Sequence, residues 1–123
     1  MAYDKENIFA KIIRGEIPAA KIYEDDDVLA FEDISKAAPV HVLVVPKGDF
    51  VSFDDFAKSG ADKVANFFAK VQKIAADLGL VENGYRLITN HGADASQSVA
   101  HFHVHILGGR ELGGLLDDDE KIR

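Results

Sequence analysis

The chain contains no cysteine and no tryptophan, and only one methionine and three prolines among its 123 residues. Without cysteine it can form neither a disulfide nor a thiolate metal site, and a cytoplasmic location is therefore the default expectation. No apolar run approaches the roughly 18 residues of a membrane-spanning helix, and the first residues lack the pattern of a signal peptide. The net charge of −7 argues against nucleic acid or an anionic membrane as the main partner.

The composition is that of a folded protein, since 47% of the residues are hydrophobic. We found no repeat, linker or low-complexity segment, which predicts a single domain over residues 1–123. Apolar residues at helical spacing predict a short helix over residues 5–14, capped by Asp4 and ended by Gly15. The same spacing predicts a long helix that begins at a Ser59 cap, with Asp62 three residues on, and stops at Gly79.

Five strands are expected, at residues 20–24, 28–32, 40–46, 85–90 and 100–107. The acidic turn at residues 25–27 is interpreted as a solvated hairpin tip, and the acidic C-terminal end as a solvated tail. With one short and one long helix, these elements predict an α+β domain on a largely antiparallel sheet.

Residues 101–107 read His-Phe-His-Val-His-Ile-Leu, in which histidine alternates with apolar residues. The two-residue period is that of a half-buried strand, with the histidines on one face and the apolar side chains on the other. A solvent-facing strand needs only generic polar residues, so three imidazoles indicate proton transfer, nucleophilic attack or metal binding.

A metal site is one interpretation of this triad. Alternate strand residues lie about 6.5–7 Å apart, so three histidines in a row reach one ion only awkwardly. A further ligand would have to come from His41 or His91, and familiar metallohydrolase motifs are absent. We expect neither a metal nor another cofactor, and a histidine metal protein stays an alternative.

The other interpretation makes His103 a nucleophile, flanked by His101 and His105 as orienting or donating groups. A phospho-imidazole is labile enough to hydrolyse again, which matches histidine to phosphorus chemistry. The preceding loop of small residues, with Gln97 and Ser98, could surround a phosphate, although an ordinary turn is the plainer interpretation.

Three further polar residues admit two interpretations each. His41 lies among apolar residues of a strand and is, taken alone, a structural histidine. Asp33 could accept hydrogen bonds from a ribose diol or cap a turn through Ser35. Asn90 could orient the site or serve turn chemistry.

The motif at residues 101–107 resembles the defining pattern of the histidine triad (HIT) superfamily. The following Gly-Gly-Arg, with residues 7–13, 31–35, 38–41 and 84–86, resembles the branch of histidine triad nucleotide-binding proteins. The similarity extends from about residue 6 to residue 112.

The resemblance implies a HIT-like fold whose sheet continues across a homodimer, and a pocket for a purine nucleotide such as AMP or GMP. It implies metal-independent hydrolysis of purine nucleoside 5′-monophosphoramidates, with His103 transiently nucleotidylated. His105 is similar to the residue that contacts a phosphate oxygen, and His101 and His41 to supports of the imidazole network. Asp33 corresponds to the ribose-binding residue, and Ser98, Gln97 and Asn90 to the polar shell near the phosphate. The apolar walls around the base correspond to Ile8, Phe9, Ile12, Phe31, Ile34 and Leu43.

Some positions depart from the family pattern. Ala100 stands where an aromatic residue commonly precedes the first histidine, His91 is an additional imidazole, and the end of the chain lacks tryptophan and proline. The leaving group is therefore open. A nucleotide-binding regulatory module with residual hydrolysis, and a hydrolase of dinucleoside polyphosphates, are the alternative functions.

Overall fold

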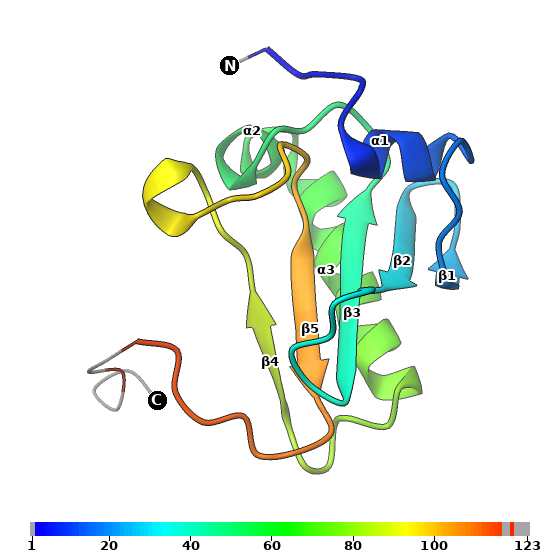
Figure 1. Cartoon of the computed structure of the whole chain (residues 1–123). Helices are drawn as coiled ribbons and strands as arrows, with labels where there is room; N and C mark the ends of the chain where they lie inside the picture. Colours follow the sequence, from blue (N-terminus) through cyan, green and yellow to red (C-terminus); the bar gives the residue numbers. More distant parts are fainter. Residues whose placement is uncertain (1, 117–118, 120–123) are drawn as a thin grey trace.

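The computed structural model describes residues 2–116 and residue 119. Five strands form one antiparallel sheet in the order β1-β2-β3-β5-β4 (Figure 1). The strands are β1 (Lys21–Glu24), β2 (Val28–Glu32), β3 (Val40–Pro46), β4 (Tyr85–Ile88) and β5 (Val104–Gly108). The helices are α1 (Ile8–Ile13), α2 (Phe53–Ala57) and α3 (Ala61–Asp77), with one 3₁₀ turn, η1 (Ala93–Ala95). This arrangement confirms the α+β class and the antiparallel five-stranded sheet.

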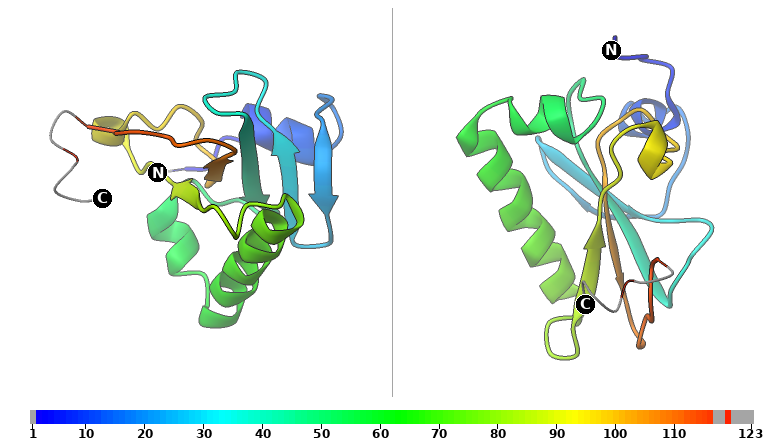
Figure 2. Two further views of the ribbon diagram at one scale, coloured as in Figure 1. Left: turned by 90° about the horizontal axis from the view of Figure 1, so that it is seen from below. Right: turned by 90° about the vertical axis from the view of Figure 1, so that its left-hand side faces the viewer.

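The two faces of the sheet carry different layers (Figure 2). The long helix α3 covers one face, where its buried residues pack with Val42, Val44, Val104 and Ile106. On the opposite face α1 packs Phe9 and Ile12 against a second cluster, formed with Leu29, Phe31, Leu43 and Val45. Because β2 and β3 are buried on both faces, they are almost continuously apolar, and their predicted bounds agree with the structure.

The starts of both predicted helices were wrong. Helix α1 begins at Ile8 rather than at residue 5, because Asn7 accepts a 2.9 Å hydrogen bond from the Ala10 N–H and caps it. Helix α3 begins after Gly60, whose φ of 134° is unlike that of a helical residue. Ser59 instead donates to the Phe56 carbonyl at the end of α2, a helix that was not predicted.

The sequence signal for α2 is the capping pattern that starts at Ser52. The Asp55 carboxylate accepts hydrogen bonds from the N–H groups of Val51 (2.7 Å) and Ser52 (2.8 Å). At the other end of the fold, β4 stops at Ile88 and β5 starts only at Val104, so the predicted strands were too long. Residues 101–103 nevertheless keep the alternation, because Phe102 is buried in the same cluster as Val104 and Ile106.

Two predicted solvated segments differ from expectation. Most of the acidic C-terminal end lies outside the described residues, but Asp119 is buried and accepts a hydrogen bond from the Leu115 N–H. In the turn between β1 and β2, the Asp25 carboxylate accepts hydrogen bonds from the Tyr23 hydroxyl (2.6 Å) and from the N–H groups of Asp27 and Val28. It also pairs with Lys70 of α3 at 2.6 Å, so the turn is tied to the helix.

No helix in the described part of the chain is both long and apolar enough to cross a membrane.

We expect Asp25→Asn to lower the free energy of unfolding by roughly 1–3 kcal/mol, the usual cost of losing charge-assisted hydrogen bonds. Asp26→Asn is the matched control, because Asp26 is exposed in the same turn. Burial raises the pKa of Asp25, but the contact with Lys70 and the hydrogen bonds that the carboxylate accepts outweigh this effect. The pKa of Asp25 is therefore lowered in the folded protein. The stabilisation is therefore complete above the carboxyl's unfolded pKa and is lost as the pH falls towards the folded value.

Urea denaturation at pH 7 and pH 3 measures both effects. Equal unfolding midpoints for the two asparagine variants at pH 7 would show that the Asp25 contacts do not stabilise the fold.

Candidate functional site

His103 lies immediately before β5, and the position of its proton follows from its hydrogen bond. The Nδ1 atom lies 2.7 Å from the His101 carbonyl oxygen, which can only accept, so Nδ1 carries the proton. The Nε2 atom is therefore the nitrogen with the free lone pair. Burial lowers the pKa of His103, which keeps the ring neutral near pH 7. An uncharged imidazole with one unprotonated nitrogen is the form required of a nucleophile.

Aromatic rings confine His103 on two sides. The Phe9 ring of α1 lies edge-on to it, with 4.9 Å between centroids, and the His105 ring lies at 5.1 Å. The Thr89 hydroxyl, just after β4, donates to the His103 carbonyl at 2.8 Å. Thr89 was not predicted as a site residue, because only the tertiary structure brings the end of β4 to the start of β5.

His101 is buried beside His103 and has its own set of hydrogen bonds. Its ring is fully buried, with Nε2 lying 2.8 Å from the Pro46 carbonyl oxygen at the end of β3. Its Nδ1 lies 2.6 Å from the Tyr3 hydroxyl. The side chain of His101 therefore anchors the segment before β5, while its carbonyl orients His103.

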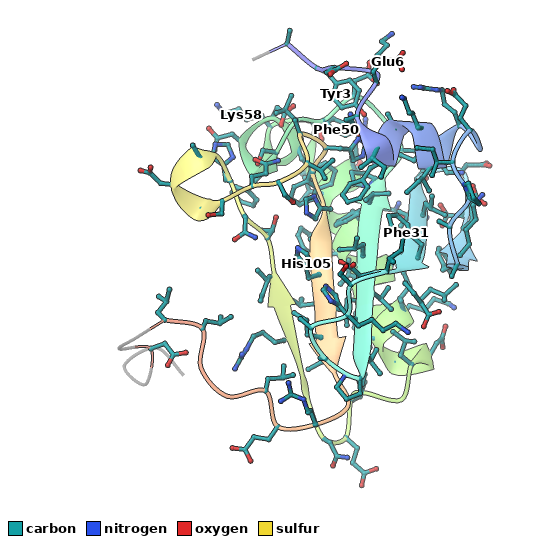
Figure 3. The ribbon with its side chains drawn as sticks, in the orientation of Figure 1. Tyr3, Glu6, Phe31, Phe50, Lys58 and His105 are labelled. Atoms are coloured by element: carbon teal, nitrogen blue, oxygen red, sulfur yellow. The ribbon has the colours of Figure 1, made fainter. Side chains whose placement is uncertain are left out.

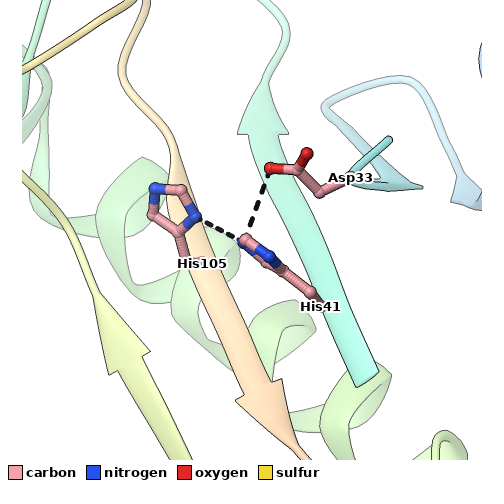
Figure 4. A group of neighbouring side chains, drawn as sticks. All are labelled: Asp33, His41 and His105. Atoms are coloured by element: carbon pink, nitrogen blue, oxygen red, sulfur yellow. Dashed lines mark hydrogen bonds and ion pairs between the residues drawn. The ribbon is translucent and has the colours of Figure 1, made fainter. Parts of the chain in front are cut away.

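Asp33, His41 and His105 form a hydrogen-bonded cluster on the face of the sheet that α1 covers (Figure 4). The Ala37 N–H donates to His41 Nδ1 at 3.0 Å, so that nitrogen is an acceptor and the proton resides on Nε2. His41 Nε2 lies 2.9 Å from His105 Nδ1 and 3.5 Å from an Asp33 carboxylate oxygen. His41 thus donates to His105 Nδ1, which leaves the His105 proton on Nε2.

His105 is consequently an oriented neutral donor beside His103. Burial and the neighbouring histidines lower its pKa to about 4. It carries no positive charge at neutral pH, but its Nε2–H can donate to an anionic oxygen.

The same cluster has the donor atoms of a metal site, since one atom from each of Asp33, His41 and His105 lies within 4.8 Å of the others. The surrounding contacts do not suit a metal. A neutral histidine that binds a metal through Nε2 carries its proton on Nδ1 and donates it to an acceptor. At His41 the Nδ1 atom faces the Ala37 N–H. Metal binding through Nε2 would therefore bring two donors, His41 Nδ1–H and the Ala37 N–H, against each other.

A cavity of about 480 Å³ opens between α1 and the sheet. Its volume is typical of pockets for small molecules. Phe9 lines it and contacts His103, and Asp33 lines it and contacts His41, so the cavity adjoins both parts of the site. Every residue predicted to surround the base lies in its wall: Ile8, Phe9, Ile12, Phe31, Ile34 and Leu43. Figure 3 shows Phe31 and His105 on neighbouring parts of the sheet.

Of the predicted polar residues, Asp33 and Ser98 lie in the wall of the cavity, and Asn90 and Gln97 do not. Ser98 is exposed and lines the cavity, as Asp33 does. Asp33 also accepts a 2.8 Å hydrogen bond from the Ser35 N–H, so it caps the turn while keeping its second oxygen near His41. Asn90 is half-buried after β4, and its side chain has no hydrogen bond within residues 2–116 and 119.

Gln97 holds the loop before His101 in shape. Its side-chain oxygen accepts from the Gly92 N–H at 3.0 Å, and its amide donates to the Val51 and Val99 carbonyls. These bonds occupy the amide, so Gln97 shapes the loop rather than presenting its side chain to a ligand. His91 is exposed in the same loop and is not part of the histidine cluster.

We expect His105 to titrate at a pKa of about 4 in the free protein, well below the roughly 6.5 of an unperturbed imidazole. Asp33→Asn should lower this pKa further, because the Asp33 charge favours the imidazolium form. Histidine ¹⁵N and ¹³C chemical shifts followed from pH 8 to pH 3.5 test this, and they also report the Nε2–H tautomers of His41 and His105. An ordinary pKa, or an Nδ1–H tautomer at His41, would contradict the proton assignment.

Comparison with known proteins places this site in a family. The HIT domain model matches residues 14–112. An uncharacterised HIT-like protein of Rickettsia prowazekii is 48% identical over 119 residues, covering 96% of this chain and 99% of the relative. The purine nucleoside phosphoramidase of Escherichia coli K12 is 43% identical over 112 residues, covering 91% and 94%.

A solved structure agrees with the sequence matches. The histidine triad protein of Clostridium difficile superposes with a TM-score of 0.84 at 43% identity, covering 92% of this chain and 98% of that one. The described fold, the alternating histidines and these matches together show that the chain belongs to the HIT family, close to bacterial HIT-like proteins and to purine nucleoside phosphoramidase.

Proposed function

We propose that this HIT-family hydrolase cleaves purine nucleoside 5′-monophosphoramidates through a covalent intermediate on His103. The observation that carries the proposal is the bond from His103 Nδ1 to the His101 carbonyl, which leaves Nε2 unprotonated. His103 also contacts Phe9, which lines a cavity of suitable size. The relationship to the Escherichia coli phosphoramidase supports the choice of substrate.

The cavity accounts for binding of the nucleoside part. Its apolar walls would bury the purine, with Phe9 and Phe31 as aromatic surfaces. The Asp33 carboxylate would accept hydrogen bonds from the ribose hydroxyls, since each oxygen has lone pairs beyond those that Ser35 and His41 use. The α-phosphorus would then lie towards His103, with Ser98 on the exposed side.

In the first step, His103 Nε2 forms a bond to phosphorus while the phosphorus–nitrogen bond of the substrate breaks. The departing amine keeps the bonding electron pair and takes a proton. The positive charge that develops on the His103 ring is stabilised by the His101 carbonyl at Nδ1. In the second step, water forms a bond to phosphorus and gives up one proton to solvent, while the bond to Nε2 breaks and its electron pair returns to that nitrogen. The nucleotide is released and His103 is neutral again.

His105 would act by hydrogen bonding rather than by proton transfer. Its Nδ1 accepts from His41, whose own Nδ1 accepts from the Ala37 amide, so no proton can be passed inward to replace one lost from His105. The Nε2–H would therefore stabilise charge on a non-bridging phosphoryl oxygen. The proton for the amine would come from solvent or from the substrate.

We expect the purified, chelator-treated protein to release AMP from adenosine 5′-phosphoramidate, and His103→Ala to abolish release while the protein still folds. His91→Ala is the matched control, because His91 is exposed and makes none of the site contacts. Mass spectrometry of the rapidly mixed enzyme, quenched in alkaline denaturant because acid hydrolyses phosphorus–nitrogen bonds, should detect an added nucleotidyl group on wild type and not on His103→Ala.

The other outcomes distinguish the alternatives. AMP binding without turnover would favour a nucleotide-binding regulatory module, and faster cleavage of a dinucleoside polyphosphate would reassign the substrate. Activity that returned only with added zinc would disprove the metal-independent mechanism.

We also propose that the active form is a homodimer in which the sheet continues across a two-fold axis. Strand β4 is at the edge of the sheet, and its Leu87 side chain is 44% exposed next to this unpaired edge. Leu87→Asp should therefore shift the protein from dimer to monomer in sedimentation velocity, because it places a charge in a contact between copies. Val81→Asp is a control, since Val81 is similarly apolar and exposed but precedes the strand. A wild-type monomer at micromolar concentration would disprove the dimer.

A cytoplasmic location stays a prediction.

A further inference from the structure

The N-terminal arm, residues 2–7, brings Tyr3 to the triad from 98 positions away in the sequence. The Tyr3 hydroxyl oxygen lies 2.6 Å from His101 Nδ1, and the two rings meet edge-on with 5.6 Å between centroids. Figure 3 shows Tyr3 on this arm, at the end of the sheet where α1 lies. Tyr3 lies outside the histidine motif and outside the residues that carry the family resemblance.

The direction of this hydrogen bond follows from the other side of the His101 ring. The Pro46 carbonyl at Nε2 can only accept, so Nε2 carries the proton. A second proton on Nδ1 would make a buried imidazolium, which burial opposes by lowering the pKa of His101. Nδ1 is therefore an acceptor and the Tyr3 hydroxyl donates. Burial raises the pKa of Tyr3, so the hydroxyl keeps its proton at neutral pH.

The lone pair on His101 Nδ1 depends on this one donor. The His101 ring has no exposed surface, and Tyr3 alone donates to Nδ1 within the described residues. Without the hydroxyl, a buried acceptor would lack its partner, and the ring would be held only through Pro46. The backbone of the same residue carries the carbonyl that fixes the His103 proton. His101 is thus bonded to Tyr3 through its ring and to His103 through its carbonyl. A shift of the His101 ring therefore also shifts the carbonyl that orients His103.

We propose that Tyr3 is a positioning residue for catalysis: by donating to His101 it sets the carbonyl that keeps His103 Nε2 free and directed at phosphorus. The inference rests on the proposed function of His103. It assigns Tyr3 to the chemical step and not to substrate binding, because Tyr3 is absent from the wall of the cavity.

Tyr3→Phe tests this by removing one oxygen atom and keeping the ring. We expect kcat for adenosine 5′-phosphoramidate to fall about fivefold, as loss of one hydrogen bond of about 1 kcal/mol implies, with KM unchanged. Lys5→Ala is the matched control. It removes the 3.9 Å ion pair between the arm and Asp49 and leaves the Tyr3 hydroxyl in place. Its kcat should equal that of wild type.

A second measurement does not depend on activity. In ¹⁵N spectra of the histidine rings, Tyr3→Phe should move the His101 Nδ1 resonance towards that of an unbonded imidazole nitrogen and broaden or shift that of His103. Lys5→Ala should leave both resonances unchanged.

Each outcome bears on the proposal. A selective fall in kcat with the His101 shift supports it. Unchanged kcat despite the shift, an equal loss in Lys5→Ala, a change in KM alone, or an unmoved His101 resonance overturns it. An inactive wild-type enzyme would instead disprove the proposed function, whereas the spectra would still report whether Tyr3 holds His101.

Discussion

The hydrogen bond from His103 Nδ1 to the His101 carbonyl is the constraint on which the site depends. A backbone carbonyl cannot donate, so the bond decides which ring nitrogen is free. Two more backbone groups act in the same way: the Pro46 carbonyl fixes the proton of His101, and the Ala37 N–H fixes that of His41, and through it that of His105. Because these backbone groups do not titrate, each keeps its role as donor or acceptor at any pH. The fold sets the protonation pattern before any ligand is present.

This pattern requires the antiparallel pairing of β3 with β5. Leu43 lies opposite His105 and His41 opposite Leu107, which places the two imidazoles diagonally on one face of the sheet. The other face of the same two strands packs under α3. A slip of one residue in this register would move the histidines into the α3 core and separate them from Asp33 and the cavity. The buried valines of β3 and β5 that hold the register therefore also hold the geometry of the candidate site.

The faces of the strands and most of the element order could be predicted from the sequence, because they follow from the local periodicity of apolar residues. The alternation in residues 101–107 gave the correct faces although the ladder begins only at Val104, and the valine-rich β3 gave correct bounds. The start of α1 failed because two capping signals competed, Asp4 and Asn7. The start of α3 failed because Ser59 bonds backwards to the end of α2, which leaves Gly60 at the N-cap. Tyr3 and Thr89 could not be found in this way, because each bonds to a histidine that only the tertiary structure brings near. The Ala37 amide is only four residues from His41, but nothing in the local periodicity marks it. A backbone N–H also has no residue identity to recognise.

Because the histidines are neutral, the groups that would bind a nucleotide differ from those that would act in the chemical step. Burial lowers the pKa of His101, His103 and His105, so no imidazolium attracts the phosphate, and the chain as a whole carries a net charge of −7. Affinity for a nucleotide would then come mainly from burying the purine in the apolar cavity and from the Asp33 contacts. The donors near phosphorus would gain strength only as negative charge builds on its oxygens and positive charge on His103. Interactions that strengthen towards the transition state accelerate the reaction without holding the product tightly. A group of neutral imidazoles next to an apolar pocket is thus suited to turnover.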